Sequence, residues 1–142
     1  MYDTAARQAM IPVFYMEYGV PDTLDGRFEM TSLHIILAMQ GMDRKLSQAL
    51  FDRFFVGVDR SLREMGIGDL SVPRHMKRMM TAFNGRRVAY EAAFRGADDA
   101  ALTDALKRNV YGTVERPDDN HVKSLTAYVR RAAASIALPE AA

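Results

Sequence analysis

Apolar residues recur every three or four positions along most of the chain, and this spacing is the feature that most constrains the fold. The clearest run lies in residues 43–65, where Asp52, Arg53 and Asp59 fall on the opposite face. Its apolar members are Leu46, Leu50, Phe51, Phe54, Phe55, Val58, Leu62 and Met65. Such spacing predicts an amphipathic helix with one face against a core. No segment alternates apolar and polar residues long enough to predict a strand, so the expected fold class is all-α.

The same helical spacing recurs in five other segments, at residues 4–16, 27–40, 71–96, 98–109 and 117–136. Gly66 follows the clearest run, and glycine readily takes the left-handed conformation that ends a helix. The pair Asn84-Gly85 interrupts the 71–96 segment, which fits either one helix that tolerates a glycine or two helices at a kink. No repeat or flexible linker divides the chain. We therefore expect a single compact domain of about six helices over residues 1–142.

The composition removes several kinds of chemistry. The 142 residues include no cysteine, which excludes thiol catalysis, iron–sulfur clusters and thiolate zinc sites. His34, His75 and His121 lie in three different predicted elements, without the spacing of a helical metal site. The sequence shows neither a phosphate-binding glycine loop nor a nucleophile elbow. We expect a protein that is not an enzyme, with no catalytic residue, metal or cofactor.

The distribution of apolar residues also bears on location. The longest stretches free of strong polarity, residues 35–39 and 132–138, are far shorter than the ~20 residues that span a bilayer. Asp3 and Arg7 stand where a secretory signal would carry an apolar core. We expect a cytoplasmic protein that is at most peripheral to the inner face of the cytoplasmic membrane.

The net charge of +1 hides a strongly basic segment. Residues 71–96 contain six basic side chains and one acidic one, whereas residues 97–120 contain three basic and six acidic ones. On a helix Arg74, Lys77 and Arg78 share one face. The neighbouring face is apolar and holds Met76, Met79, Met80 and Phe83. This pattern is typical of a solvated face over a core stripe, or of a docking surface where cations attract an anionic partner and methionines adapt to its shape. Ribosomal RNA, anionic lipid headgroups and an acidic protein would all satisfy it.

Several ordered motifs surround this basic segment. The longest reads LREMGIGDLSVP over residues 62–73, followed by MKRM at 76–79, AFNGR at 82–86 and AY at 89–90. Upstream stand FY at 14–15, GVPDT at 19–23, DGRF at 25–28 and LH at 33–34, and downstream stands RNVY at 108–111. Together these motifs resemble the ubiquinol-cytochrome c chaperone family over roughly residues 7–111. The chain is shorter than the mitochondrial members, which suggests a bacterial form.

The resemblance implies an all-helical assembly factor for respiratory complex III. The mitochondrial relatives are chaperones for newly made cytochrome b; they work with a small partner subunit and associate with the mitochondrial ribosome. For this chain the resemblance implies newly made cytochrome b as the protein client, and the ribosome as a further candidate partner. The candidate contact residues for client or ribosome are Leu70, Val72, Arg74, Met76, Lys77, Arg78, Met79, Arg86 and Arg87.

The other motif residues have structural explanations. Gly66 and Gly68 suit the backbone of a turn, and Pro73 suits the first turn of the following helix. Asp69 suits either a cap on that helix or an acceptor for backbone N–H groups in the turn. Asp22 and Thr23 are candidate helix caps, with Arg27 as an ion-pair partner for one of the neighbouring acids. Tyr90 is expected in the core with its hydroxyl at the edge. Gly85 belongs to the same structural group.

Two other classes of function stay open at this point. The basic segment also suits a ribosome- or RNA-binding helical module, whose affinity would fall steeply with salt. An enzyme that acts on quinone or haem would need a closed pocket with convergent polar groups. Self-association into a homodimer also stays open, whereas no feature indicates DNA as a partner.

Overall fold

The computed structural model describes residues 2–141, with side chains placed for residues 2–136. Seven helical segments and no strand occur in this range, which confirms the expected all-α class. The segments are α1 (Tyr2–Ala9), α2 (Pro12–Met16), α3 (Leu24–Met39), α4 (Arg44–Glu64), α5 (Val72–Arg95), α6 (Ala100–Asn109) and α7 (Asp119–Ala141). The expected domain over residues 1–142 includes Met1 and Ala142, which lie outside the described residues.

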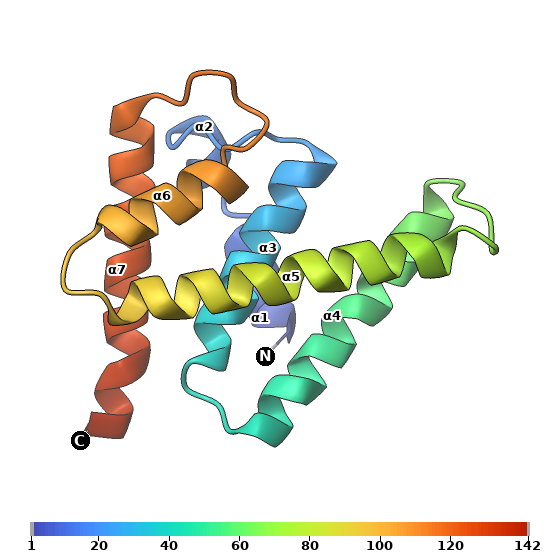
Figure 1. Cartoon of the computed structure of the whole chain (residues 1–142), viewed down its shortest axis with the longest axis horizontal. Helices are drawn as coiled ribbons and strands as arrows, with labels where there is room; N and C mark the ends of the chain where they lie inside the picture. Colours follow the sequence, from blue (N-terminus) through green and yellow to red (C-terminus); the bar gives the residue numbers. More distant parts are fainter. Residues whose placement is uncertain (1, 142) are drawn as a thin grey trace.

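Helix α3 is the centre of the fold. It packs against α1, α4, α5 and α7, and Figure 1 shows α5 crossing it while α7 stands on one side. Such a helix has little surface left for water, and accordingly most side chains from Met30 to Met39 are buried. The helical spacing of residues 27–40 predicts an inward face of Phe28, Leu33, Ile36 and Leu37; the last three are buried and Phe28 is half-buried against the core.

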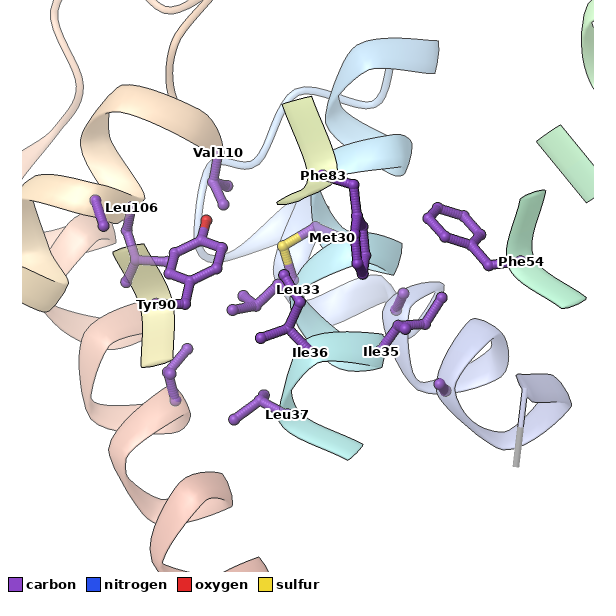
Figure 2. Close-up of a cluster of buried hydrophobic side chains, with 14 of the residues drawn as sticks. Met30, Leu33, Ile35, Ile36, Leu37, Phe54, Phe83, Tyr90, Leu106 and Val110 are labelled. Carbon is purple, nitrogen blue, oxygen red and sulfur yellow. The ribbon is translucent and has the colours of Figure 1, made fainter. Parts of the chain in front are cut away.

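Helix α5 contributes the large side chains that close this core. Phe83 is fully buried and lies 5.4 to 5.9 Å, between ring centroids, from three phenylalanines of α4, which are Phe51, Phe54 and Phe55. Figure 2 shows Phe83 and Tyr90 on either side of the α3 residues Met30, Leu33 and Ile36. Aromatic rings at these separations add edge contacts to the area they bury. The side chains of α5 thus fix its position across α3.

Residues 4–16 do not form the single helix that the periodicity predicts. The chain leaves helical geometry at Ile11, whose ψ is 129°, and α2 starts afresh with Pro12 at its first position. Proline has no N–H to continue the hydrogen-bond ladder and disfavours helical geometry in the residue before it. One predicted helix therefore becomes two, which accounts for seven segments where about six were expected.

Local capping sets several other boundaries, and Thr23 and Gly66 take the roles predicted for them. Thr23 accepts a hydrogen bond from the Gly26 amide (3.1 Å) at the start of α3, and Asp43 accepts one from the Leu46 amide (2.8 Å) at the start of α4. Gly66 ends the α4 region with a φ of 90°, in the left-handed region that favours glycine. The predicted apolar stripe of α4 is wrong at its two ends, because Leu46 and Met65 are exposed there, beyond the helices that cover its middle.

The structure decides the open question about α5. This helix runs unbroken from Val72 to Arg95 through Asn84-Gly85. At its C-terminus Arg130 of α7 donates to the carbonyl oxygens of Phe94 (3.0 Å) and Ala93 (3.1 Å) and pairs with Asp99 (2.7 Å). The guanidinium thus gives the Phe94 carbonyl a donor, shares the Ala93 carbonyl with the Gly96 amide (3.1 Å), and lies at the favourable end of the helix dipole.

Candidate functional site

The α4–α5 hairpin projects from the rest of the molecule and contains most of the candidate contact residues. In Figure 1 its connection, residues 65–71, forms the tip that lies farthest from α6 and α7. The connection is closed by backbone bonds, since the amides of Ser71 (2.8 Å) and Val72 (3.1 Å) both donate to the carbonyl of Gly68. A fixed tight turn therefore holds the tip in one shape.

Three of the candidate cations share the outer face of α5 next to this tip. Arg74, Lys77 and Arg78 are all exposed, as their helical spacing predicts. Among the ion pairs of residues 2–136, none includes any of the three. Arg78 donates instead to Nδ1 of His75 (2.6 Å), one turn away. These positive charges face solvent without an acidic neighbour, so they are available to an anionic partner.

Arg86 and Arg87 have acidic partners within the protein. Arg86 Nε lies 2.6 Å from Glu29 Oε1 of α3, in a pair whose side chains are 23% and 9% exposed respectively. Arg87 Nε lies 3.2 Å from Glu91 Oε2, which also accepts from Gln40 (2.9 Å). Of the five candidate cations, these two are therefore already paired, and Arg86 joins α5 directly to α3.

The apolar candidates also differ in where they lie. Leu70 at the tip is 98% exposed, whereas Val72, two residues later, is buried in the core. Met76 and Met79 are half-buried. The sequence pattern places all four beside the basic face, but the turn at residues 65–71 points Leu70 outward and Val72 inward.

An open groove runs between α4 and α5 behind the basic face. Its volume is about 720 Å³, and its apolar lining comprises Phe55, Val56, Met76 and Met80. Its charged lining comprises Asp52, Asp59, Arg60, Arg63 and Glu64, all on one face of α4. An apolar floor with charges of both signs at the rim suits a peptide segment with apolar side chains and polar flanks.

Sequence reasoning missed most of the α4 side of this groove. Val56 is 53% exposed although it stands among buried neighbours in the chain, and Met80 was assigned only to the apolar stripe of α5. One signal was present, since Asp52, Val56, Asp59 and Arg63 follow helical spacing on one α4 face. The sequence does not show that this face of α4 is only partly covered, because that depends on how far α4 and α5 separate beyond the tip (Figure 1).

Asp69 differs from its predicted role in the tip, whereas Gly68 lies within the turn and its carbonyl accepts from the Ser71 and Val72 amides. Asp69 does not cap α5; its carboxylate pairs with Arg63, which also pairs with Asp59 (2.7 Å). Gly68 does not have a positive φ, and a Cβ built there meets no atom within 4 Å. Arg63 lies in the last helical turn of α4, and the connection at residues 65–71 folds back so that Asp69 comes within reach of its guanidinium. Pro73 lies in the first turn of α5, as predicted.

The motif at residues 19–27 builds the start of α3. Asp22 Oδ1 pairs with Arg27 (2.8 Å), as predicted for one of the acids near Arg27. A Cβ on Gly26 would lie 1.9 Å from the carbonyl oxygen of Pro21, so the backbone before α3 packs directly on its first turn. Gly19 has a φ of +68°, and a Cβ there would lie 2.2 Å from His121 of α7. These residues serve the close approach of backbone segments.

Two buried polar groups behind the hairpin explain other motif residues. Tyr90 is fully buried, and its hydroxyl makes no hydrogen bond with the placed side chains, although it was expected at the edge of the core. Burial raises the pKa of Tyr90, so the hydroxyl stays neutral. His34 donates from Nδ1 to the Met30 carbonyl (2.8 Å) and accepts at Nε2 from the Tyr128 hydroxyl (2.7 Å). Burial lowers the pKa of His34, which favours this neutral form.

The groove between α4 and α5 combines apolar surface with charged side chains. No group of three or more histidine, aspartate or glutamate side chains that could hold a metal ion occurs among them. The groove between α4 and α5 is open to solvent and is lined by no histidine, serine or tyrosine. Within the same range, the helices include none that is both long and apolar enough to cross a bilayer.

Comparisons with known proteins agree with this arrangement. The chain is 29% identical over 125 residues to "Protein CBP3, mitochondrial" of Saccharomyces cerevisiae, a match that takes in 82% of this chain but only 37% of the length of the yeast protein. The crystal structure of the Cbp3 homologue from Brucella abortus superposes with a TM-score of 0.81 at 40% identity, over 95% of this chain and 77% of that one. Residues 16–141 match the family described as ubiquinol-cytochrome C chaperone, so the match includes α7, which the quoted motifs did not reach. The chain therefore belongs to the ubiquinol-cytochrome c chaperone family.

Proposed function

We propose that this protein is a non-enzymatic chaperone that binds newly made cytochrome b during assembly of respiratory complex III. Membership of the chaperone family supports a role in complex III assembly. The yeast relative is much longer than this chain. Cytochrome b as the client, the ribosome contact and the partner subunit of the mitochondrial relatives are therefore proposed for this chain. The proposed location is the cytoplasm, at the inner face of the membrane into which the client is inserted.

The observation that carries the proposal is the open groove between α4 and α5. A chaperone for a membrane protein has to cover apolar segments and then release them, which requires an accessible apolar surface of moderate affinity. The exposed Val56 and the half-buried Met76 and Met80 provide such a surface above the buried Phe55, and methionine side chains adapt to different partner shapes. The charged rim, together with Arg74, Lys77 and Arg78, suits the polar ends of an apolar segment.

This groove changes the set of contact residues. Leu70, Arg74, Met76, Lys77, Arg78 and Met79 remain candidates, since all six are exposed or half-buried on the hairpin. Val72 is buried, and Arg86 and Arg87 are paired, so we assign these three to the structure of the hairpin. Val56 and Met80 join the candidates because they line the groove.

The test compares two exposed valines of the hairpin. Val56→Asp places a charge on the floor of the groove, and Val88→Asp makes the same change at a 70% exposed position of α5 that does not line it. We expect Val56→Asp to reduce both complex III accumulation and co-purification of cytochrome b, and Val88→Asp to leave both unchanged. Equal effects of the two variants would remove the groove from the proposal. Normal complex III and cytochrome b in a strain that lacks the gene would remove the function itself.

The unpaired cations of α5 favour a second candidate, the RNA-binding module. This alternative predicts binding to ribosomal RNA that weakens steeply with salt, as counterions are released from phosphates. A filter-binding titration at two salt concentrations tests it, with reversal of Arg74, Lys77 and Arg78 to glutamate as the variant. Undetectable or salt-independent binding would reject it.

Light scattering at micromolar concentration tests the homodimer, which a strict monomer would exclude.

A further inference from the structure

The tip of the α4–α5 hairpin presents an apolar side chain to solvent where the fold does not require one. Leu70 is 98% exposed, more than any other large apolar residue with a placed side chain. Met65, at the end of α4 and on the same tip, is also exposed. One exposed leucine alone is common on protein surfaces, but Leu70 and Met65 are exposed together on one fixed tip, which makes the tip a candidate contact surface.

Positive charge surrounds this apolar tip. Residues 60–78 contain five basic and two acidic side chains, and one of the acidic ones, Asp69, is already paired with Arg63. Arg60, Arg74, Lys77 and Arg78 have no ion-pair partner within residues 2–136. The tip therefore offers both an apolar side chain and several free cations to the same partner.

The segment around α6 has the opposite net charge. Residues 97–120, which include α6 and the loop after it, contain six acidic and three basic side chains. In Figure 1 α6 lies on the side of the molecule away from the hairpin tip. The acidic side chains of this segment lie mostly before and after α6, and the resulting asymmetry creates a field that would turn the tip, and not these acidic stretches, toward an extended anionic surface.

We propose that the hairpin tip docks on an anionic lipid bilayer, with Leu70 inserted between the lipids and Arg74, Lys77 and Arg78 on their headgroups. A bilayer fits better than a folded protein, because Leu70 stands on a convex tip and does not line the groove. A protruding side chain can insert between lipids, whereas it cannot enclose a side chain of a protein partner. Cations beside an inserted apolar residue match the negative leaflet surface that attracts basic segments. The groove behind the tip would then open close to the membrane surface.

The chain has no tryptophan, so one introduced at the tip is a specific reporter. We would titrate Leu70→Trp with vesicles of phosphatidylcholine containing about a third phosphatidylglycerol, and with vesicles of phosphatidylcholine alone. We expect a blue shift of the emission and quenching by brominated lipid tails with the anionic vesicles only. Leu46→Trp, at an exposed leucine on the far end of α4, is the matched control and should show neither. A shift at position 46 equal to that at 70, or none at 70, would overturn the proposal.

Sedimentation with the same vesicles tests the cations. Reversal of Arg74, Lys77 and Arg78 to glutamate should weaken binding at least ~100-fold, since each basic residue near an anionic surface contributes about a factor of five. The control reverses Lys107, Arg116 and Lys123, three exposed cations elsewhere, and so has the same net charge. Equal weakening by both triple variants would refute docking through the tip. Binding to ribosomal RNA with none to the vesicles would also refute it.

These measurements contain no client, so their failure is separate from failure of the proposed chaperone function. The variants change exposed side chains, and circular dichroism verifies that each retains the helical content of the parent. Binding should also fall when salt rises from about 0.1 M to about 1 M, because the screening length shrinks about threefold. Vesicle binding that ignores salt would contradict the role given to the three cations.

Discussion

Removal of the Arg86 guanidinium should destabilise the protein strongly, although the residue lies in the most basic segment of the chain. Arg86 Nε lies 2.6 Å from Glu29, whose side chain is only 9% exposed. Without the arginine, the Glu29 carboxylate would stay in a largely dry site with no opposite charge. Loss of one partner of a buried pair typically costs 3–5 kcal/mol. Arg86 itself is 23% exposed, so we expect the lower end, about 3 kcal/mol, for Arg86→Met.

The assay is urea and thermal unfolding followed by circular dichroism, arranged as a double-mutant cycle. Methionine keeps the apolar stem of arginine, so Arg86→Met reports on the charge. A loss of about 3 kcal/mol should lower the Tm by about 10 °C for a chain of this size. Glu29→Gln should cost less, because the remaining Arg86 can still reach water. The double variant should recover most of the loss, since it leaves no buried charge unpaired.

The adjacent arginine supplies the control. Arg87 pairs with Glu91 of its own helix in a more exposed setting, so Arg87→Met should cost less than about 1 kcal/mol. If Arg86→Met costs no more than Arg87→Met, Glu29 does not depend on Arg86. The two arginines would then return to the set of candidate contact residues on α5.

Three further predictions concern other parts of the fold. Burial lowers the pKa of His34, so the unfolded chain binds more protons than the folded one between that pKa and about 6.5. Unfolding titrations should therefore show the free energy of unfolding falling as pH drops through this window, by at most about 1.4 kcal/mol per pH unit. The His34→Gln variant should show a smaller slope. In the same unfolding assays, Gly85→Ala should stabilise the protein by about 0.5–1 kcal/mol, because a Cβ there meets no other atom. Gly26→Ala should destabilise it by more than about 2 kcal/mol, because a Cβ there meets the backbone of Pro21. A gain of stability from Gly26→Ala would contradict this packing. Arg130→Met should cost about 2 kcal/mol in urea unfolding, since it strips partners from the last carbonyls of α5, and no loss would deny it that capping role.

The motif residues show which features local sequence predicts well. Thr23 and Gly66 act within a turn or two of the backbone that they cap or close, so their roles follow from local sequence alone. The break at Pro12 was equally local, and the prediction missed it because the apolar periodicity continues across the proline. The prediction that Asp69 caps α5 is wrong, because Arg63 in the last turn of α4 pairs with the Asp69 carboxylate that would otherwise accept from the backbone amides of α5.

The candidate site was harder to predict because exposure depends on distant partners. Arg74 and Arg86 look alike in the sequence, yet only Arg86 meets Glu29, which lies 57 residues earlier. Leu70 and Val72 are two residues apart, and the turn sends one to solvent and the other to the core. The α4 face of the groove is visible as a helical stripe, but a stripe does not say whether a neighbouring helix covers it.

The sequence by itself determined that the chain is helical, where most of its helices begin and end, and to which family its motifs belong. These properties follow from backbone geometry and side chains within about four residues of one another. Tertiary structure alone decided that α5 is continuous, that Arg130 of α7 caps it, and which cations of the basic segment remain free. The physical reason is that a helix fixes which residues share a face, whereas the packing of α5 across α3 fixes which of those faces reach water.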